Sequence, residues 1–293
     1  MVYIVIPVHN RIFYTRQCLE SLKMQELKEF KIVVIDSGST DGTGEMIEQE
    51  FPEVVLLHGN GSLWWAGAIN LGVQYALDHG AEYIMTLNND TVAAENLVEK
   101  MMFWAKIEPH ALLGALAIDA MTQMPIYGGE TVDWKLARFK SLLDILTQEE
   151  RHGLHEVTHF PGRGLLIPAE VFGKVGLYDA GHFPHYAADY DFTHRARKMG
   201  YKIFCNYDAK LYIYPDASGD AELRKKKSIR SYYNHLFGIK GGGNLKVFWR
   251  YAVRNCPKSY LPTFLFLGIS RRTFGYLFEW MNEYLNTAWR KLT

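Results

Sequence analysis

Cysteines and long apolar runs are scarce in this chain of 293 residues. The three cysteines, Cys18, Cys205 and Cys256, lie far apart and form no CxxC pair. This pattern argues against a disulfide framework or a structural zinc site, and it fits a reducing cytosol. No run reaches the roughly 18 apolar residues of a membrane span. Residues 1–7 read as a first strand and lack the basic and apolar regions of a signal peptide.

Two glycine-rich nucleotide-binding signatures are also missing. The dinucleotide fingerprint G-x-G-x-x-G should follow the first strand, but the turn there is Pro7-Val8-His9-Asn10. No GxxxxGK[ST] segment occurs anywhere in the chain, which excludes a P-loop.

Charge is balanced overall but unevenly distributed. Residues 221–293 hold fourteen Lys and Arg against three acids, whereas the remaining residues hold eighteen against twenty-nine. This asymmetry predicts an acidic body and a basic tail region that meets something anionic. Nucleic acid is not the expected partner because the body is acidic. Hydrophobic residues make up 48% of the chain, enough for a sizeable core.

Strand and helix patterns alternate through the first part of the chain. Apolar strands are expected at 2–6, 31–35, 54–57 and 83–87, with helices at 12–25, 43–50, 66–79 and 93–107. This alternation predicts a mostly parallel sheet covered by helices. Asp36 and Asp90 follow the second and fourth strands, so they are expected at the edge where such sheets bind ligands. A carboxylate there suits Mg²⁺ or Mn²⁺. The alternative is that Asn89 and Asp90 only cap the next helix.

The second part of the chain is less regular. Three histidines, His152, His155 and His159, have metal-site spacing, but solvated histidines are favoured because the segment is polar and has no acid partner. Trp64 and Trp65 precede a helix, and burial in the core is favoured over stacking on a ligand. The remaining expected elements are strands at 112–118, 165–168, 201–205 and 209–214, and helices at 135–147, 169–175 and about 188–200.

Two acids open the helix near residue 188. Asp189 and Asp191 lie in its first turn, where carboxylates favour the positive end of the helix dipole. The functional alternative is that one of them is a general base that points into the ligand crevice.

Several segments together resemble the family-2 glycosyltransferases, the inverting enzymes of the GT-A fold that assemble bacterial cell-surface polysaccharides. Residues 5–11 resemble the opening strand and loop of that family, and residues 33–43 (VVIDSGSTDGT) resemble its nucleotide-binding segment. Residues 60–72 are similar to its N-x-G…G…N-x-G region, and residues 88–90 occupy the place of its metal-binding DxD motif. The acceptor-side segment matches 162–179, and the "ED" helix matches 185–195. The order and spacing of these segments, over about residues 2–240, carry the resemblance.

The resemblance implies an α/β domain of the GT-A fold at 1–240, with a nucleotide-sugar-binding half at 1–118 and an acceptor-side half at 119–240. A basic, aromatic and helical region follows at 241–293. Asp189 is implied as the general base with Asp191 as the alternative, and Asp90 as the ligand of Mg²⁺ or Mn²⁺. The residues implied at the nucleotide sugar are Pro7, Asn10, Asp36, Ser37, Asn60, Gly67, Asn70 and Asn89, and those on the acceptor side are Arg163, Gly164 and Tyr186.

The implied reaction is inverting transfer of a hexosyl or deoxyhexosyl group, such as rhamnosyl, from a UDP- or dTDP-linked donor. The implied acceptor is a glycan or polyprenyl-linked glycan in cell-envelope polysaccharide synthesis. Two departures keep a non-catalytic nucleotide-sugar- or glycan-binding scaffold as the alternative: Asn88 replaces the first acid of DxD, and Ala188 replaces the Glu of "ED". The family's metal-binding His after the last core strand is also missing, and Asp216 is the candidate substitute.

Aromatic and basic residues interleave on helical segments over 244–293. This pattern suits helices that lie in the interface of an anionic membrane. It would place a cytoplasmic protein on the inner face of the plasma membrane. The alternative is that the aromatic residues pack on the body or on a second subunit of a homo-oligomer.

Overall fold

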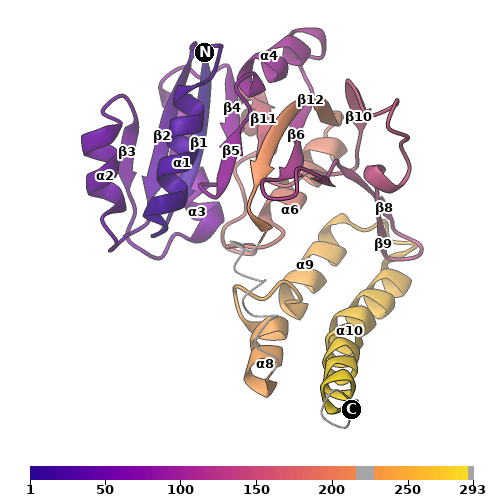
Figure 1. Ribbon diagram of the computed structural model, residues 1–293. Helices are drawn as coiled ribbons and strands as arrows, with labels where there is room; N and C mark the ends of the chain where they lie inside the picture. The colour runs from indigo at the N-terminus through magenta and orange to yellow at the C-terminus, as the bar shows by residue number, and fades with distance from the viewer. Residues whose placement is uncertain (216–227, 290–293) are drawn as a thin grey trace. The chain divides into compact units, whose positions relative to one another are not determined.

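The computed structural model describes residues 1–215 and 228–289 (Figure 1). Asp216 and the basic run at 224–227 lie outside the described residues. The chain divides into two compact units, one of residues 1–131 and 140–215, and one of residues 132–139 and 216–293. The expected boundary at residue 240 therefore falls within the second unit.

Parallel strands build the first half of the sheet, as expected. Strand β1 (Val2–Val8) pairs in parallel with both β2 (Phe30–Asp36) and β4 (Tyr83–Thr86), and β2 pairs in parallel with β3 (Val55–His58). The connecting helices are α1 (Ile12–Lys23), α2 (Thr43–Glu50) and α3 (Trp64–Asp78). Since all four strands run the same way, the loops that follow them gather at one edge of the sheet.

Antiparallel pairing enters beyond β4. Strand β11 (Leu165–Pro168) lies antiparallel between β4 and β6 (Leu112–Asp119), and β12 (Ile203–Ile213) is parallel to β6. The result is a mixed ten-stranded sheet in the order β10-β12-β6-β11-β4-β1-β2-β3, where β10 is Leu154–Glu156. Two short strands pair off this path, β5 (Thr91–Ala93) with β12 and β7 (Pro125–Tyr127) with β6. The remaining helices of this unit are α4 (Leu97–Ile107), α5 (Ala169–Val175) and α6 (Ala188–Lys198).

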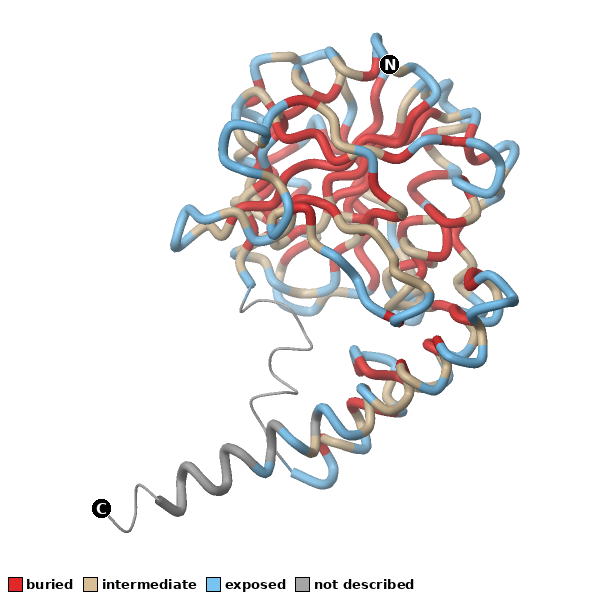
Figure 2. The backbone as a smooth tube through the Cα atoms, turned by 90° about the vertical axis from the view of Figure 1, so that its right-hand side faces the viewer, coloured by how far each residue is buried: buried red, intermediate tan, exposed pale blue. Residues whose placement is uncertain are grey.

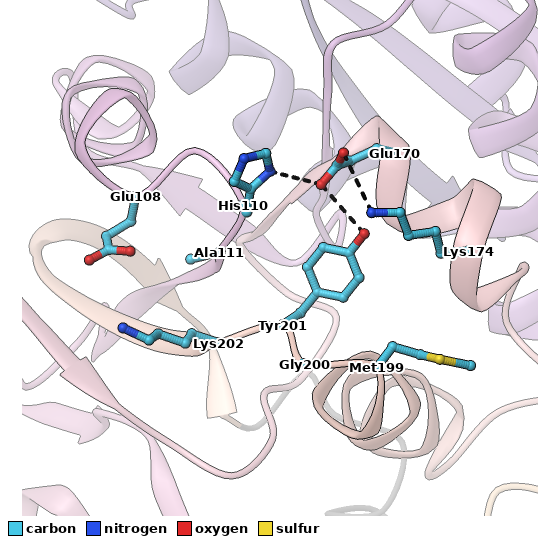
Figure 3. A pocket seen from close by; sticks show the side chains of 9 residues that line it. All are labelled: Glu108, His110, Ala111, Glu170, Lys174, Met199, Gly200, Tyr201 and Lys202. Carbon is cyan, nitrogen blue, oxygen red and sulfur yellow. Dashed lines mark hydrogen bonds and ion pairs between the residues drawn. The ribbon is translucent and has the colours of Figure 1, made fainter.

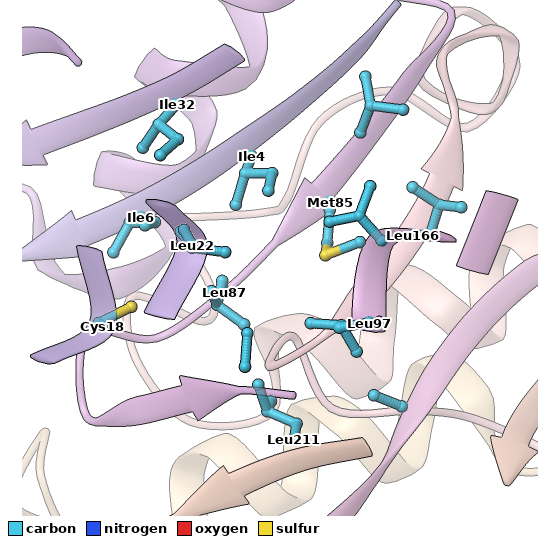
Figure 4. Packing of buried hydrophobic residues seen from close by; sticks show 14 of the residues in the cluster. Ile4, Ile6, Cys18, Leu22, Ile32, Met85, Leu87, Leu97, Leu166 and Leu211 are labelled. Carbon is cyan, nitrogen blue, oxygen red and sulfur yellow. The ribbon is translucent and has the colours of Figure 1, made fainter. Parts of the chain in front are cut away.

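Helices cover both faces of the sheet because the strands bury alternate side chains on opposite sides. On one face Ile4 and Ile6 of β1 pack with Cys18 and Leu22 of α1 (Figure 4). On the other face α3 approaches so closely that a Cβ at Gly72 would lie 2.4 Å from Val5. Figure 2 shows the buried residues concentrated along these strands. The mixed α/β sheet with covering helices confirms the expected fold class.

Three local expectations were wrong. The helix expected from Ala93 begins at Leu97, because Thr91–Ala93 instead pairs as a strand with β12. The helix expected at 135–147 is a hairpin of β8 (Glu130–Asp133) and β9 (Arg138–Ser141), followed by the 3₁₀ turn η1 (Leu142–Asp144). The two strands expected at 201–214 form one strand with an irregularity between Asn206 and Lys210. Pairing with distant strands outweighed the local pattern at 91–93 and 203–213, and pairing within a hairpin outweighed it at 130–141.

The second unit contains α8 (Ile229–Phe237), α9 (Leu245–Asn255) and α10 (Leu261–Trp289). The hairpin tip at 132–139 packs with these helices: the ring of Trp134 lies 5.0 Å from that of Phe264, and Arg271 donates hydrogen bonds to the carbonyl oxygens of Leu136 and Ala137. None of the helices in the described ranges combines the length and apolarity that crossing a membrane requires.

Candidate active site

Asp36 ends β2 at the ligand-binding edge of the sheet. Its carboxylate is almost fully buried and accepts a hydrogen bond from the Ser39 N–H at 2.8 Å. The Ser37 N–H donates to the Val8 carbonyl at 2.9 Å, which ties this loop to the end of β1. The hydroxyl of Ser37 is enclosed and has no hydrogen-bond partner. A buried polar group without a partner is costly, so a ligand that reached this hydroxyl would supply the missing hydrogen bond.

Asn10 joins the loops that follow β1 and β2. Its N–H donates to the Ser39 hydroxyl at 2.7 Å, and its side-chain oxygen accepts from the Thr40 N–H at 2.9 Å. Both Asn10 and Arg11 have left-handed backbone conformations, with φ of 59° and 67°. Pro7, in contrast, lies within β1 opposite Ile35.

The three residues in the place of the DxD motif have separate partners. The Asn88 side-chain oxygen accepts from the indole N–H of Trp65 at 2.9 Å. Asn89 is buried and donates to the Thr15 hydroxyl at 2.9 Å. Asp90 remains partly exposed and lies 3.0 Å from the guanidinium of Arg11.

These residues fit a divalent cation only together with a donor. Asp90 is the one carboxylate of the motif, and the described ranges 1–215 and 228–289 contain no group of three or more His, Cys, Asp or Glu side chains that could hold a metal. Mg²⁺ commonly keeps several waters and takes one or two carboxylates plus substrate phosphates. Asp90, with a diphosphate and water, therefore matches this donor set, whereas an all-protein cage does not.

Asp189 lies in the first turn of α6. Its two carboxylate oxygens accept the N–H groups of Gly162 and Tyr190, each at 2.9 Å. Burial raises the pKa of Asp189 above its ordinary value, and the two backbone hydrogen bonds oppose that rise. A carboxylate of raised pKa is a better proton acceptor near neutral pH, which suits a general base.

Trp65 connects the two halves of this site, a role that the sequence interpretation missed. Besides its bond to Asn88, its ring packs so closely on Gly162 that a Cβ there would lie 2.2 Å from the indole. The same Gly162 holds Asp189. The expectation of two core tryptophans was wrong, because Trp64 is exposed and Trp65 is only partly buried. No local pattern marks Trp65, since its contacts with Asn88, Gly162 and the ring of Tyr178 are all distant in sequence.

Asp191 is placed differently from Asp189. Its side chain is fully buried and pairs with the Arg195 guanidinium at 2.9 Å. Arg195 in turn donates to the carbonyl oxygens of Val175 and Leu177, at the end of α5. The geometry gives Asp191 a structural part and favours Asp189 as the base.

Three other residues expected at the nucleotide sugar, Asn60, Gly67 and Asn70, have structural contacts. Asn60 is exposed and accepts bonds from the N–H and hydroxyl of Ser62. Asn70 pairs with both backbone groups of Tyr178, at 2.8 and 3.0 Å, and so ties α3 to the turn before α6. Gly67 lies in the first turn of α3, where an added Cβ would make only ordinary contacts with Leu63.

The residues expected on the acceptor side also differ from one another. Arg163 lies over the ring of Tyr127 at 5.9 Å, and its Nε is enclosed without a hydrogen-bond partner. Gly164 bridges the sheet, since its N–H donates to Thr86 and its carbonyl accepts from Ala115, each at 2.8 Å. Tyr186 is partly exposed beside the ring of His185. Arg163 and Tyr186 are therefore open to a ligand role, whereas Gly164 has an architectural one.

A buried polar network lies beside Asp189. His159 is fully buried, and its ring nitrogens contact Glu130 Oε1 and the Thr158 hydroxyl, both at 2.9 Å. Glu130 Oε1 also accepts the Tyr190 hydroxyl at 3.0 Å. The expectation of solvated histidines was wrong for His159. Its acid partner lies on β8, 29 positions away along the chain.

Away from these residues, a hollow of about 370 Å³ lies at the amino ends of β6 and β12 (Figure 3). Three of the groups that line it are paired: Glu170 contacts His110 at 2.9 Å and Lys174 at 4.0 Å. The hollow is thus at the opposite end of these strands from the edge that carries Asp36 and Asp90.

Comparison with known proteins identifies the family. The family model described as "Glycosyl transferase family 2" matches residues 3–174, more than half of the chain. The chain belongs to glycosyl transferase family 2.

Among curated relatives of this glycosyltransferase, the succinoglycan biosynthesis protein ExoA of Rhizobium meliloti (strain 1021) is 25% identical over 95% of the chain and 78% of its own length. Glycosyltransferase GlyG of Streptococcus pneumoniae serotype 4 is 29% identical over 34% of each chain. An uncharacterized glycosyltransferase of Rickettsia prowazekii is 28% identical over 65% of this chain and 57% of its own. The glycosyltransferase thus spans only about a third to three fifths of the last two relatives.

Solved structures show that the glycosyltransferase has the GT-A architecture. S. aureus TarS 1-349 superposes with a TM-score of 0.58 at 14% identity, covering 94% of this chain and 72% of that one. GalNAc-T7 with UDP, GalNAc and Mn²⁺ superposes with a TM-score of 0.61 at 15% identity, covering 90% and 54%. At such identities the likeness concerns the fold alone.

Proposed function

We propose that this glycosyltransferase moves a hexosyl or deoxyhexosyl group from a UDP- or dTDP-linked donor to a hydroxyl of a glycan or polyprenyl-linked glycan, with inversion. The observation that carries the proposal is the Trp65 bridge. It links the Asn88–Asp90 loop to Gly162, which donates a hydrogen bond to the Asp189 carboxylate. Residues 1–118 supply the donor side, and the segment from 119 onward supplies the base.

The chemistry assigns a part to each group. Asp189 takes the proton of the acceptor hydroxyl as that oxygen attacks, typically worth about 10²–10⁴-fold in rate. A single base opposite the leaving group gives one displacement and therefore inversion. Asp36, Ser37 and Asn10 shape the loop that receives the nucleoside. Mg²⁺ or Mn²⁺, held by Asp90 with the donor diphosphate, would neutralise charge on the leaving nucleoside diphosphate.

Three comparisons support the substrate classes. ExoA is named for polysaccharide biosynthesis, TarS has been crystallised with UDP, and GalNAc-T7 with UDP, GalNAc and Mn²⁺. They favour a nucleoside-diphosphate sugar as donor and a cell-envelope glycan as acceptor.

The decisive experiment replaces Asp189 by Asn and measures nucleotide binding and sugar transfer separately. Asp189→Asn should abolish transfer while UDP or dTDP still binds. The matched variant is Asp191→Asn, which alters the same helical turn and should lower stability rather than remove the base. Near-normal transfer by Asp189→Asn would refute the assignment of Asp189 as the general base. Binding without transfer in the unaltered protein, across donor sugars and acceptors, would support the scaffold alternative.

We also propose that the helical unit contacts an anionic membrane, where a polyprenyl-linked acceptor would be held. Residues 228–278 contain eight Lys and Arg and no acid. Each helix exposes large apolar side chains: Ile229, Tyr233 and Phe237 on α8, Trp249 and Val253 on α9, and Phe266, Phe274, Phe278 and Met281 on α10. At 100° per residue the four side chains of α10 fall within about 120° of one face. Aromatic side chains beside cations suit an anionic lipid interface.

Liposome co-sedimentation tests this contact. Binding to vesicles with phosphatidylglycerol should exceed binding to neutral vesicles and should fall steeply with salt. Trp249→Ser with Phe274→Ser should weaken it, whereas Phe103→Ser, which removes an exposed aromatic ring from α4, should not. Concentration-dependent dimerisation without vesicle binding would instead support a homo-oligomer.

A further inference from the structure

The guanidinium of Arg11 lies on the carboxylate implied as the metal ligand. Its Nη1 is 3.0 Å from Asp90 Oδ2, although the two residues belong to loops after different strands. The side chains of Arg11 and Asp90 are 37% and 19% exposed, so both are accessible to a ligand. Ion pairs as exposed as this one are weak and can exchange partners.

The backbone at Arg11 is held in an unfavourable conformation. Asn10 and Arg11 are consecutive residues with positive φ and neither is glycine. Such conformations cost roughly 1–3 kcal/mol each and persist where the surroundings enforce them, often at ligand clamps. Here the Asp41 carboxylate accepts the N–H of Ile12 at 2.9 Å, and Asn10 is bonded to residues 39 and 40. The loop is therefore built to present Arg11 at this edge of the sheet.

Arg11 is also the sole Lys or Arg in the loops that follow β1 to β4, at 9–11, 37–42, 59–63 and 87–90. A nucleoside diphosphate bound at this edge carries negative charge close to Asp90. A nearby guanidinium matches phosphate oxygens with two parallel hydrogen bonds. Without Arg11, these loops would offer no cationic side chain to the negative charge of the diphosphate.

We propose that Arg11 is a diphosphate-binding cation and that it exchanges partners when the donor binds. In the absence of nucleotide, Arg11 neutralises Asp90 and competes with a divalent cation for that carboxylate. When a donor arrives, Arg11 turns to the phosphate oxygens and leaves Asp90 open to Mg²⁺ or Mn²⁺. This inference rests on the proposed function, because it assumes a nucleoside-diphosphate donor.

If Arg11 exchanges partners in this way, Arg11→Ala should change the affinities for nucleotide and for Mn²⁺ in opposite directions. Binding of UDP and dTDP in EDTA, measured by calorimetry, should weaken by about tenfold or more because a charge-assisted contact is lost. Binding of Mn²⁺ alone, measured by electron paramagnetic resonance, should tighten by roughly two- to fivefold because a competitor for Asp90 is gone. Arg11→Lys should retain part of the UDP affinity, since it keeps the charge but loses the two-bond geometry.

The matched control is Arg16→Ala, on the helix α1 that follows Arg11. Arg16 forms an exposed pair with Glu50 at 2.8 Å and points to α2, so its loss should leave both affinities unchanged. Thermal unfolding of both variants shows whether each is folded. Unchanged UDP affinity in folded Arg11→Ala, or affinities for UDP and Mn²⁺ that weaken together, would overturn the exchange. If the unaltered protein binds neither UDP nor dTDP under any condition, the proposed function itself fails.

Discussion

Replacement of Gly162 by Ala tests whether Trp65 holds the donor and base sides of the site together. The added Cβ would lie 2.2 and 2.3 Å from two atoms of the indole ring and 3.5 Å from the Asp189 Cβ. The indole has to move, and its bond to Asn88 is lost with it. Overpacking of this kind costs about 1–3 kcal/mol. At roughly 2–4 °C per kcal/mol, the melting temperature should fall by several degrees.

A second substitution separates the clash from other effects of the methyl group. The two indole atoms nearest the new Cβ belong to the six-membered ring, which phenylalanine at position 65 does not place there. Trp65→Phe should therefore relieve much of the cost of Gly162→Ala, so the double variant is more stable than the sum of the two singles predicts. Gly173→Ala, on α5, is the matched control because an added Cβ there meets nothing within 4 Å.

The assays are thermal unfolding, UDP binding and sugar transfer. Transfer should fall more than UDP binding, because Gly162 also donates its N–H to the base. Strictly additive stability effects, or full transfer activity in Gly162→Ala, would refute the placement of Trp65.

Three further predictions concern the base and its supports. First, the acid limb of kcat/KM should lie at higher pH than an ordinary aspartate would give, because burial raises the pKa of Asp189 and only the ionised form accepts a proton. Since the folded protein holds this proton more tightly than the unfolded chain, the stability contributed by Asp189 is present below the unfolded pKa and lost as pH rises through the raised one. Second, Glu130→Ala should destabilise by about 1–3 kcal/mol, because buried His159 loses a partner, and should reduce transfer but spare UDP binding; the exposed Glu156→Ala should do neither. Third, Asn70→Ala should cost about 1–3 kcal/mol in a denaturant titration, because both backbone groups of Tyr178 lose a partner.

Much of the ligand edge could be predicted from the sequence because it depends on local order. A strand that ends in Asp36 and another that runs into Asn89 and Asp90 must place these acids at one edge of a parallel sheet. The proposal of Asp189 as the base likewise rests on its place in a motif, which can be read from the sequence. The separation of Asp189 from Asp191 was not predictable, because it depends on the distant carbonyl groups that Arg195 reaches.

Features made by long-range contacts could not be found in the same way. The pairing of β5 with β12 could not be predicted, because the sequence at Thr91–Ala93 also suits the start of a helix. His159 resembles its two exposed or partly exposed neighbours in sequence, and only its pairing with Glu130 marks it as a buried support. The same holds for Trp65 and Arg11, because their partners Asn88 and Asp90 lie in a different loop.

The hairpin tip at 132–139 limits how the helical unit can be deleted or exchanged between relatives. Residues 132–139 fold with α9 and α10 through Trp134, Leu136 and Ala137, so the unit is made from two stretches of chain separated by residues 140–215. A deletion that begins at residue 241 would strip Trp134 of its aromatic neighbours and leave an apolar tip in water. The unit is therefore not a detachable tail: an exchange of these helices between relatives has to include the hairpin as well.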